Sequence, residues 1–488
     1  MKSNYVSFKY IVILTCILQL LTPARTLDAI VIGAGVSGLK AAESLKNNGF
    51  TVTVLEARNR IGGRIWSDES LGFPVDMGAS WIHGIDNNPV YTLANQNKVT
   101  TYKFDYSNIR ISSNKYASTP ITQQKFLEIE TDFKNALREV LKTTQESDTV
   151  SKAYDYYVSQ KSPDEFTQNI MKNYIKDVEL NYGMPIEKLS LKYFTKGGDG
   201  SEAVSGDEHL IPSGYIKIFE PLTKDLNIIK NSKVTEIIQN STTNKVTVNT
   251  TPSIRSSGES DKTYTADYVV VTVPLGVLKN NKISFVPALS QNKQNAIKNL
   301  GFGLLDKIVV EFEEVFWEDV NNFTFIEMPI SQFSYAVNLN KVAGKKALLF
   351  LGPSESKYSP TYYSETKDQI ISKLVDYLKL LYPTKSIKVK NSLLTKWKED
   401  EFSYGSYSSY VVGSLPENIK EFNVNEGRVY FAGEHTSEQN FSYVQGAYLS
   451  GIRVAKDIVQ ASGLVFKDGV ILRNSLAMIV AFLSICLL

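Results

Sequence analysis

Cysteine is almost absent from this chain of 488 residues, and the two that occur, Cys16 and Cys486, lie close to its ends. A chain without cysteine between those ends has no disulfide framework, thiolate nucleophile or cysteine-ligated metal site there. Histidine is scarce too, with 3 residues. The net charge is +2 and no basic stripe occurs, which argues against a nucleic-acid partner. We therefore expect no bound metal ion and no nucleic acid.

Long apolar runs are also missing, although both ends carry short ones. Residues 1–24 combine Lys2 and Lys9 with an apolar run and the small residue Ala24, which is the layout of a secretory signal peptide. A buried first strand or a membrane anchor is the alternative. Residues 463–488 end in an apolar tail shorter than the ~20 residues of a spanning helix and resemble a GPI-anchor signal. A short tail anchor, or a tail packed on the domain, stays open.

These two segments place the protein in the secretory pathway, extracellular or at the cell surface, with membrane attachment through a lipid anchor as one option. Four Asn-x-Ser/Thr triplets bear on glycosylation. Those at Asn240, Asn249 and Asn322 fit a glycosylated exterior. The triplet at Asn440 adjoins a segment that we expect to be buried, so we expect no glycan there.

The most informative segment is 29–64, in which an apolar run meets three glycines and then a helical stretch. Gly33 permits a tight turn, Gly35 lets a pyrophosphate approach the backbone, and Gly38 lets the helix pack closely on the strand. The helix N-terminus offers free N–H groups and the positive end of its dipole. A second apolar run ends at Glu56, which is placed to accept hydrogen bonds from a ribose. This order of strand, glycine turn, helix, second strand and acid predicts dinucleotide binding.

The continuation to Arg64 makes the cofactor more specific. The double glycine at 62–63 allows a second close approach, and Arg64 can donate two hydrogen bonds to a pyrophosphate. At this point the chain resembles the flavin-containing amine oxidases, in which this continuation marks FAD rather than NAD. The resemblance covers nearly the whole chain between the terminal segments. Some relatives attach FAD through a cysteine, but Ser406 stands at that position, which implies non-covalent FAD.

Segment 76–84, DMGASWIHG, resembles the polyamine oxidase branch of this family. The resemblance implies that four consecutive residues run beside the flavin: Gly78, Ala79, Ser80 and Trp81. It also implies that His83 faces the substrate, where a neutral imidazole can donate to or accept from an amine nitrogen. The alternative is a structural histidine.

Segment 300–308 resembles the family segment that carries an active-site lysine, here Lys307. By this resemblance Lys307 would hold a water near flavin N5, and a cation there can stabilise a reduced flavin. A solvated lysine at the start of a strand is the alternative. Tyr407 and Tyr443 fall where the family places two aromatic side chains that flank the substrate amine. Ordinary core tyrosines are the alternative for both.

Three further cofactor contacts follow from the resemblance. Glu434 lies in a second FAD signature, Val444 opens a final helix whose N-terminus can stabilise negative charge on the flavin, and Val234 would meet the adenine. Recognition of a distal substrate amine is less specific. Glu179 is one candidate acid, and Asp207 or Glu208 is another, although such acids commonly only solvate a loop.

The predicted fold is α/β: a Rossmann-like FAD-binding domain assembled from separated segments, plus an α+β substrate-binding domain. The FAD-binding segments are 27–95, 205–285 and 395–462, and the substrate-binding segments are 96–204 and 286–394. The sequence pattern further predicts helices over 122–144, 165–182, 370–381 and 444–460, and strands over 264–273, 307–312 and 428–432.

The resemblance implies an FAD-dependent polyamine oxidase that acts on spermine- or spermidine-type amines. A hydride equivalent would pass to flavin N5, and oxygen would yield an aldehyde, a smaller amine and hydrogen peroxide. One alternative is a secreted L-amino-acid oxidase, or another oxidase of primary or secondary amines. The former needs an arginine for the substrate carboxylate, and none lies in 78–84. A non-catalytic FAD-bound cell-surface protein is the alternative from another class. A histone demethylase is disfavoured because the chain has no long coiled insertion.

Overall fold

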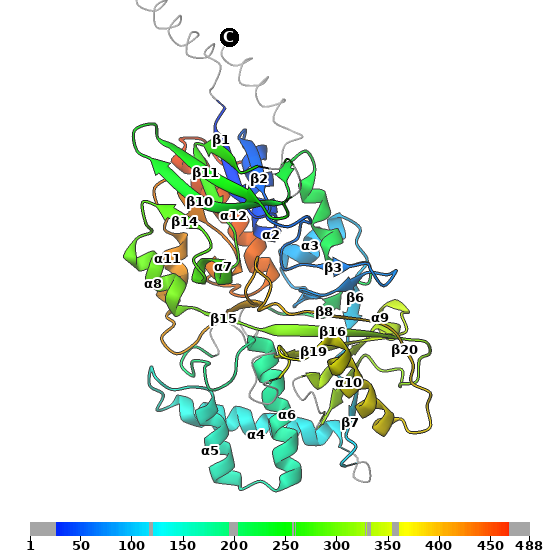
Figure 1. The fold of residues 1–488 in the computed structure, drawn as a ribbon. Coiled ribbons are helices and arrows are strands. Elements are labelled where there is room, and N and C mark those ends of the chain that lie inside the picture. The colour runs from blue at the N-terminus through cyan, green and yellow to red at the C-terminus, as the bar shows by residue number, and fades with distance from the viewer. Residues whose placement is uncertain are drawn as a thin grey trace, which may run out of the picture.

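The computed structural model describes residues 26–467, apart from 117–120, 195–203, 256–257, 259, 327, 329–332 and 354–360 (Figure 1). The predicted signal peptide, 1–24, and the tail from 468 onward lie outside the described residues. Within those ranges, no helix has both the length and the apolar character needed to cross a membrane.

A five-stranded parallel sheet forms the centre of the domain that the sequence predicts to bind FAD. Its order is β22 (Val429–Phe431), β13 (Tyr268–Val271), β1 (Asp28–Ile32), β2 (Thr51–Leu55) and β9 (Asn227–Ile229). A parallel sheet is covered on both faces, which explains why β1 and β13 read as almost continuous apolar runs. On one face, α2 (Val36–Asn47) packs against α12 (Val444–Ala461), so the two ends of the chain share one core.

A second sheet covers the opposite face. It consists of β12 (Lys262–Ala266), β11 (Lys245–Pro252), β10 (Ser232–Asn240) and β14 (Ser284–Val286). Its apolar side packs on the β1 and β13 side chains that point away from α2. Three short helices lie beside it: α7 (Leu275–Lys279), α8 (Gln291–Asn299) and α11 (Pro416–Asn423).

The domain predicted to bind the substrate is built on a six-stranded mixed sheet. Its order is β20 (Val389–Leu394), β16 (Leu305–Phe312), β19 (Ala347–Pro353), β18 (Tyr335–Asn338), β17 (Asn322–Phe325) and β7 (Ile109–Ser112). One face packs on α10 (Lys367–Leu381). Below the sheet in Figure 1 lie three helices: α4 (Gln123–Leu141), α5 (Ser151–Lys161) and α6 (Glu165–Tyr182).

Small elements join the two domains. They are β3 (Ser67–Asp68) with β4 (Val75–Asp76), β15 (Gly301–Gly303) with β21 (Tyr407–Ser409), and the sheet of β5 (Trp81–Ile82), β8 (Glu208–Leu210) and β6 (Tyr102–Phe104). The helices α3 (Pro89–Gln96) and α9 (Leu339–Ala343) complete the regular structure outside the 3₁₀ turns.

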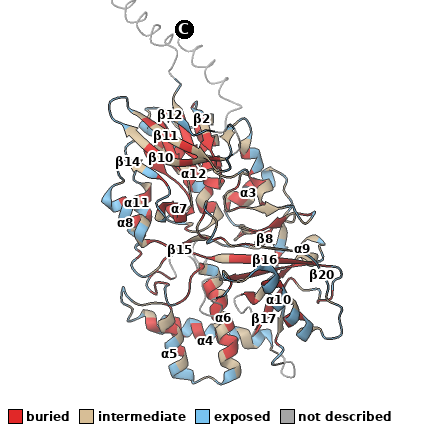
Figure 2. Ribbon diagram, in the orientation of Figure 1, coloured by how far each residue is buried: buried red, intermediate tan, exposed pale blue. Residues whose placement is uncertain are grey.

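Local sequence signals explain the helices around the cavity. In α4, Ile129, Phe133, Ala136 and Val140 are buried at spacings of three and four residues, which is the stripe of an amphipathic helix (Figure 2). The helix α6 starts after Asp164, whose carboxylate accepts a hydrogen bond from the backbone N–H of Thr167. It ends at Gly183, which has a left-handed φ of +64°.

The predicted α/β class is confirmed, and so are all four predicted helices, within three residues at each end. The single strand predicted over 264–273 is wrong, because β12 and β13 belong to different sheets. The chain breaks at Asp267, whose buried carboxylate accepts from the backbone N–H of Asp28 and pairs with Lys245. The Asp267 side chain thus contacts β1 and β11, and the chain passes from the sheet of β12 to the sheet of β13 at this residue.

Two other expectations differ from the structure. The helix α8 was assigned with the substrate-binding segment 286–394, but it packs on α11 and α7 beside the second sheet. Asn322 was expected to fit a glycosylated exterior. It is fully buried in β17, and its amide donates to the carbonyl oxygens of Tyr106 and Asn108, so a glycan has no room there.

Candidate functional site

One large cavity, of about 1280 Å³, joins the two domains. It starts at the carboxyl ends of β1 and β2, where ligands of open parallel sheets bind. It passes below α12 and continues between the six-stranded sheet and the helices α4 and α6. Most of the residues predicted for cofactor and substrate line this one space.

The glycine turn has the construction that a dinucleotide site requires. Gly33 has a φ of +107°, and its N–H donates to the carbonyl oxygen of Leu55 over 2.8 Å. A Cβ at Gly38 would overlap the Gly33 carbonyl oxygen, so Gly38 permits the contact between α2 and the turn. Gly38 lies outside the cavity lining and therefore acts through packing.

Gly35 is different, because its surroundings in the protein do not require a glycine. It lines the cavity at the N-cap of α2, and a Cβ there would have no protein atom nearer than 4.0 Å. No side chain caps this helix end, so its first N–H groups are available to a ligand. The space beside Gly35 therefore suits an anionic group bound at the helix N-terminus.

Glu56 lies at the end of β2 and lines the same part of the cavity. Its carboxylate accepts from the backbone N–H groups of Ala34 (2.6 Å) and Arg58 (2.8 Å). Burial raises the pKa of Glu56, although these hydrogen bonds favour the ionised form. Each carboxylate oxygen keeps a further lone pair, so Glu56 can also accept from ribose hydroxyl groups.

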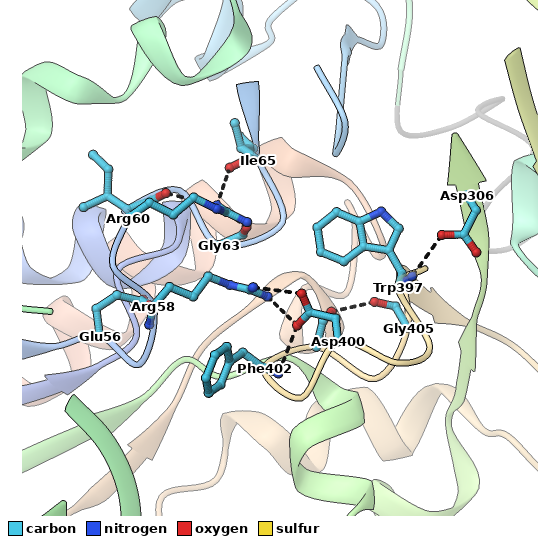
Figure 3. A network of polar contacts seen from close by, with 12 residues as sticks. Glu56, Arg58, Arg60, Gly63, Ile65, Asp306, Trp397, Asp400, Phe402 and Gly405 are labelled. Carbon is cyan, nitrogen blue, oxygen red and sulfur yellow. Dashed lines mark hydrogen bonds and ion pairs between the residues drawn. The ribbon is translucent and has the colours of Figure 1, made fainter. Parts of the chain in front are cut away.

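A network next to the glycine turn was missed by the sequence reasoning (Figure 3). Arg58 forms a bidentate pair with Asp400, with N–O distances of 2.8 and 2.7 Å. Asp306 accepts from the backbone N–H of Trp397 over 2.9 Å, which fixes the same loop from the substrate-binding domain. Arg58 belongs to the motif that follows Glu56 and could have been singled out from the sequence. No local signal identifies Asp400, which is distant in sequence, as its partner.

Arg64 and Glu434 lie together, as two residues of one cofactor site should. The guanidinium of Arg64 donates to Glu434 Oε1 (2.8 Å) and to the carbonyl oxygen of Ser406 (3.0 Å). Ser408 Oγ donates to the same Glu434 oxygen over 3.0 Å. The other oxygen of Glu434 is buried and has no hydrogen-bond partner among the described residues. Glu434 lines the cavity, so this oxygen can accept from a ligand.

Two other predicted cofactor contacts also line the cavity. Val444 opens α12 after Tyr443, and no side chain caps this helix either. Val234 lies in β10 beside an irregularity in its pairing with β11. The two uncapped helix ends, the open space at Gly35 and the unsatisfied oxygen of Glu434 together fit a dinucleotide, whose central pyrophosphate is anionic and whose sugar units carry hydroxyl groups.

Lys307 is buried in β16 and crosses to the segment 78–81. Its ammonium donates to the carbonyl oxygens of Asp76 (2.9 Å) and Gly78 (2.6 Å), and to Ser80 Oγ. It also lies 5.7 Å from the centre of the Trp81 ring. Burial lowers the pKa of Lys307, while the buried carboxylate of Asp76 opposes that change. Lys307 thus holds this segment in place and puts a cation in the cavity wall.

Tyr407, Tyr443 and His83 line the cavity together. The Tyr407 hydroxyl donates to the carbonyl oxygen of Leu180, and burial raises its pKa. The rings of His83 and Tyr443 meet edge to face with centres 5.4 Å apart. His83 Nδ1 lies 2.8 Å from the Glu208 carboxylate. An ionised carboxylate only accepts, so Nδ1 carries the proton and Nε2 is the acceptor in the neutral ring.

The candidate acids separate clearly. Glu208 lines the cavity, whereas Asp207 pairs with Lys103 at the surface, over 2.9 Å. Glu179 is fully buried outside the lining, where its carboxylate accepts from the backbone N–H of Ile186 over 3.2 Å. Two positions earlier on α6, Asp177 faces the cavity instead. Residues two apart lie on nearly opposite sides of a helix, so one of the two acids had to face away.

The comparisons with known proteins agree with this geometry. Residues 36–459 match the family described as flavin containing amine oxidoreductase. The chain is 31% identical to polyamine oxidase 2 of Arabidopsis thaliana, over 89% of this chain and 88% of the relative. It is 31% identical to polyamine oxidase 4 of Oryza sativa subsp. japonica, over 94% and 95% of the two chains.

A third relative, lysine-specific histone demethylase 1 homolog 1 of Arabidopsis thaliana, is 30% identical over 89% of this chain but only 52% of its own. The cofactor is therefore FAD, held non-covalently, and the reaction is oxidation of a CH–NH group. The chain belongs to the flavin containing amine oxidoreductase family.

Proposed function

We propose that this protein is a polyamine oxidase that acts on spermine- or spermidine-type amines and passes the electrons to oxygen. The observation that carries the proposal is the position of Tyr407, Tyr443 and His83 in one cavity with Lys307 and Glu208. The rings of Tyr407 and Tyr443 can lie on either side of an amine nitrogen. The imidazole of His83, oriented by Glu208, can accept a hydrogen bond from that nitrogen. The names of the relatives support the same substrate class.

Bound FAD supplies an acceptor for a hydride equivalent from the carbon beside the amine nitrogen, and oxygen then regenerates it with release of hydrogen peroxide. The residues of the chain bind and orient the substrate. Tyr407 is fixed by its hydrogen bond to Leu180, and Tyr443 by its place at the start of α12. His83 Nε2 can accept the N–H of the reacting amine, because Glu208 holds the proton on Nδ1.

The charges of the cavity wall argue against an L-amino-acid substrate. Arg64 is engaged with Glu434 and Ser406, and Arg58 with Asp400. Arg138, which lines the outer part of the cavity on α4, is exposed and donates to Asn135. Lys307 donates to three acceptors of the protein, and Glu208, which lines the cavity with the tyrosine pair, repels a substrate carboxylate.

A peroxide-coupled assay tests the proposal with spermine, spermidine, their acetylated forms, tyramine and leucine. We expect activity with the polyamines, and activity with leucine alone would refute the proposal. Anaerobic mixing with each amine, followed by the absorbance of the oxidised flavin, separates slow turnover from none. A flavin that no amine bleaches would favour a non-catalytic FAD-bound protein.

We further propose that the enzyme acts in the secretory pathway, outside the cell or at its surface. The signal-peptide pattern of residues 1–24 and the anchor-like pattern of 463–488 support this location. Treating intact expressing cells with a phosphatidylinositol-specific phospholipase tests the anchor. Release of activity into the medium is expected, and activity retained in the cytosol of fractionated cells would contradict the location itself.

A further inference from the structure

The end of the cavity farthest from the glycine turn has a polar wall that the reaction does not use. One side is a face of the six-stranded sheet, on which side chains two residues apart in a strand point the same way. The lining residues on the strands β7, β17 and β18 of this face are Ile109, Ile111, Asn322, Thr324 and Tyr335. The helix α6 lies opposite and presents Asp177.

Asp177 makes no hydrogen bond or ion pair among the described residues. Asp177 is partly buried in the cavity wall, and this burial raises its pKa to about 7. The neighbouring Lys176 lowers this pKa and Glu130 raises it. Glu130 is already paired with Lys134 over 2.7 Å. A desolvated carboxylate without an ion-pair partner is unfavourable, and a ligand cation would relieve that cost.

Two neighbouring polar groups independently point to a ligand. Asn322 is 0% exposed, and its side-chain N–H groups donate to backbone carbonyl oxygens, but its Oδ1 has no partner among the described residues. The hydroxyl of Tyr335 is buried and equally without a partner in the described part of the chain. Tyr335 lies close enough to Asp177 for the carboxylate to raise the pKa of the phenol, after the larger effect of burial.

These groups share one chemical property, since a carboxylate, an amide oxygen and a hydroxyl can all accept hydrogen bonds. An ammonium group carries several N–H donors and one positive charge, so it matches all three. Glu208 already has a side-chain partner, because one of its oxygens lies 2.8 Å from His83 Nδ1 and the other accepts from the backbone N–H of Gly84 over 3.1 Å, whereas Asp177 has no such partner among the described residues.

We propose that Asp177, together with Asn322 Oδ1 and the Tyr335 hydroxyl, binds a second, charged nitrogen of the substrate. The site thereby selects diamines and polyamines over monoamines. This inference rests on the amine oxidation proposed above, because it concerns the far end of the same substrate. It assigns the distal contact to Asp177, whereas the candidates from the sequence are Glu179, Asp207 and Glu208.

The test measures binding without turnover. The full-length protein with its flavin chemically reduced is titrated anaerobically in a calorimeter with spermine and with octylamine, which has one nitrogen. Asp177→Asn should weaken spermine binding about tenfold or more, the size expected for a charged hydrogen bond, and leave octylamine binding within about twofold. Tyr335→Phe should weaken spermine binding about threefold. Asp155→Asn removes an exposed acid on α5, outside the cavity lining, and should change neither affinity.

Three results would overturn the inference: no measurable binding of spermine by the unmodified protein, equal spermine affinity in the Asp177→Asn variant, or equal weakening of both amines. Bleaching of the oxidised flavin is recorded in parallel. If spermine binding depends on Asp177 but no amine bleaches the flavin, the distal site stands and the oxidase proposal fails. If spermine bleaches the flavin while the variant binds it normally, the oxidase proposal stands and the distal site fails.

Discussion

The contrast between Gly35 and Gly38 leads to a sharp prediction about the cofactor site. A Cβ at Gly38 would overlap the backbone carbonyl oxygen of Gly33, which no rotamer change can relieve. Gly38→Ala must therefore displace α2 from the turn, and overpacking of this kind costs about 1–3 kcal/mol of stability. A Cβ at Gly35 would meet no protein atom within 4.0 Å, and the φ of −75° suits alanine. Gly35→Ala should change the stability of the apoprotein by less than about 1 kcal/mol.

For the affinity for FAD, we expect Gly35→Ala to have the larger effect of the two substitutions. The added methyl group in Gly35→Ala occupies the space through which a pyrophosphate reaches the N–H groups of α2. Loss of one hydrogen bond to a charged group costs about 1.5–3 kcal/mol, so FAD should bind roughly 10- to 100-fold more weakly. At a FAD concentration of 100 times the unmodified dissociation constant, FAD stabilises the protein by about 2.7 kcal/mol. A hundredfold weaker variant would gain only about 0.4 kcal/mol.

Urea unfolding of each apoprotein, with and without FAD, measures both quantities in one experiment. We expect Gly38→Ala to lower the free energy of unfolding of the apoprotein, and Gly35→Ala to lower only the increment due to FAD. Calorimetric titration with FAD provides the dissociation constant independently. A Gly35→Ala protein that binds FAD with unchanged affinity would refute the close approach. Equal destabilisation of the two apoproteins would refute the distinction drawn between the glycines.

Three other predictions concern the substrate end. Lys307→Met removes the cation from the wall and should slow the reaction of the reduced flavin with oxygen about tenfold or more in stopped-flow mixing, with an unchanged rate as the contrary result. Tyr407→Phe removes the hydroxyl but keeps the ring, so it should lower the free energy of unfolding in urea by about 1 kcal/mol. Anaerobic flavin reduction should slow less than about tenfold, and a larger loss of rate would give the hydroxyl a direct role in the reaction. Spermine binding to the reduced enzyme should strengthen as the pH rises through about 7, because Asp177 loses its proton there; a pH-independent affinity, or the same profile in Asp177→Asn, would contradict this. The titratable or charged groups around Asp177 are Lys176, Glu130, Tyr174 and Tyr335.

The sequence predicted those parts of the site that depend on local backbone geometry. Gly33, Gly35 and Glu56 could be identified because a strand, a turn and a helix N-terminus are encoded within one short segment. Long, periodic helices such as α4 and α6 were equally accessible, since their buried stripes and caps are local. The alternation of strands and helices was sufficient for the α/β class.

Features that depend on contacts between distant segments were not predictable in this way. Neither residue of the pair formed by Arg58 and Asp400 specifies the other, because the loop that carries Asp400 is brought to the turn by the fold. The orientation of α6 about its axis turns Asp177 toward the cavity and Glu179 away from it, and that orientation depends on which side of the helix packs on the rest of the protein. The break at Asp267 likewise depends on partners in two other strands.

The charges along the cavity are ordered in a way that fixes the direction of both ligands. At the glycine turn the wall offers uncapped helix N–H groups and the guanidinium groups of Arg58 and Arg64, all of which favour phosphate. Beyond the tyrosine pair it offers the carboxylates of Glu208 and Asp177, which favour ammonium groups. The cations Lys134 and Arg138 that also line it are exposed on α4. With FAD bound at the turn, the space left for a cationic chain lies beyond the tyrosine pair. The proposed contact of the second substrate charge with Asp177 leaves an uncharged nitrogen to lie between Tyr407 and Tyr443, and we therefore expect the same ordering of charge to orient both the cofactor and the substrate.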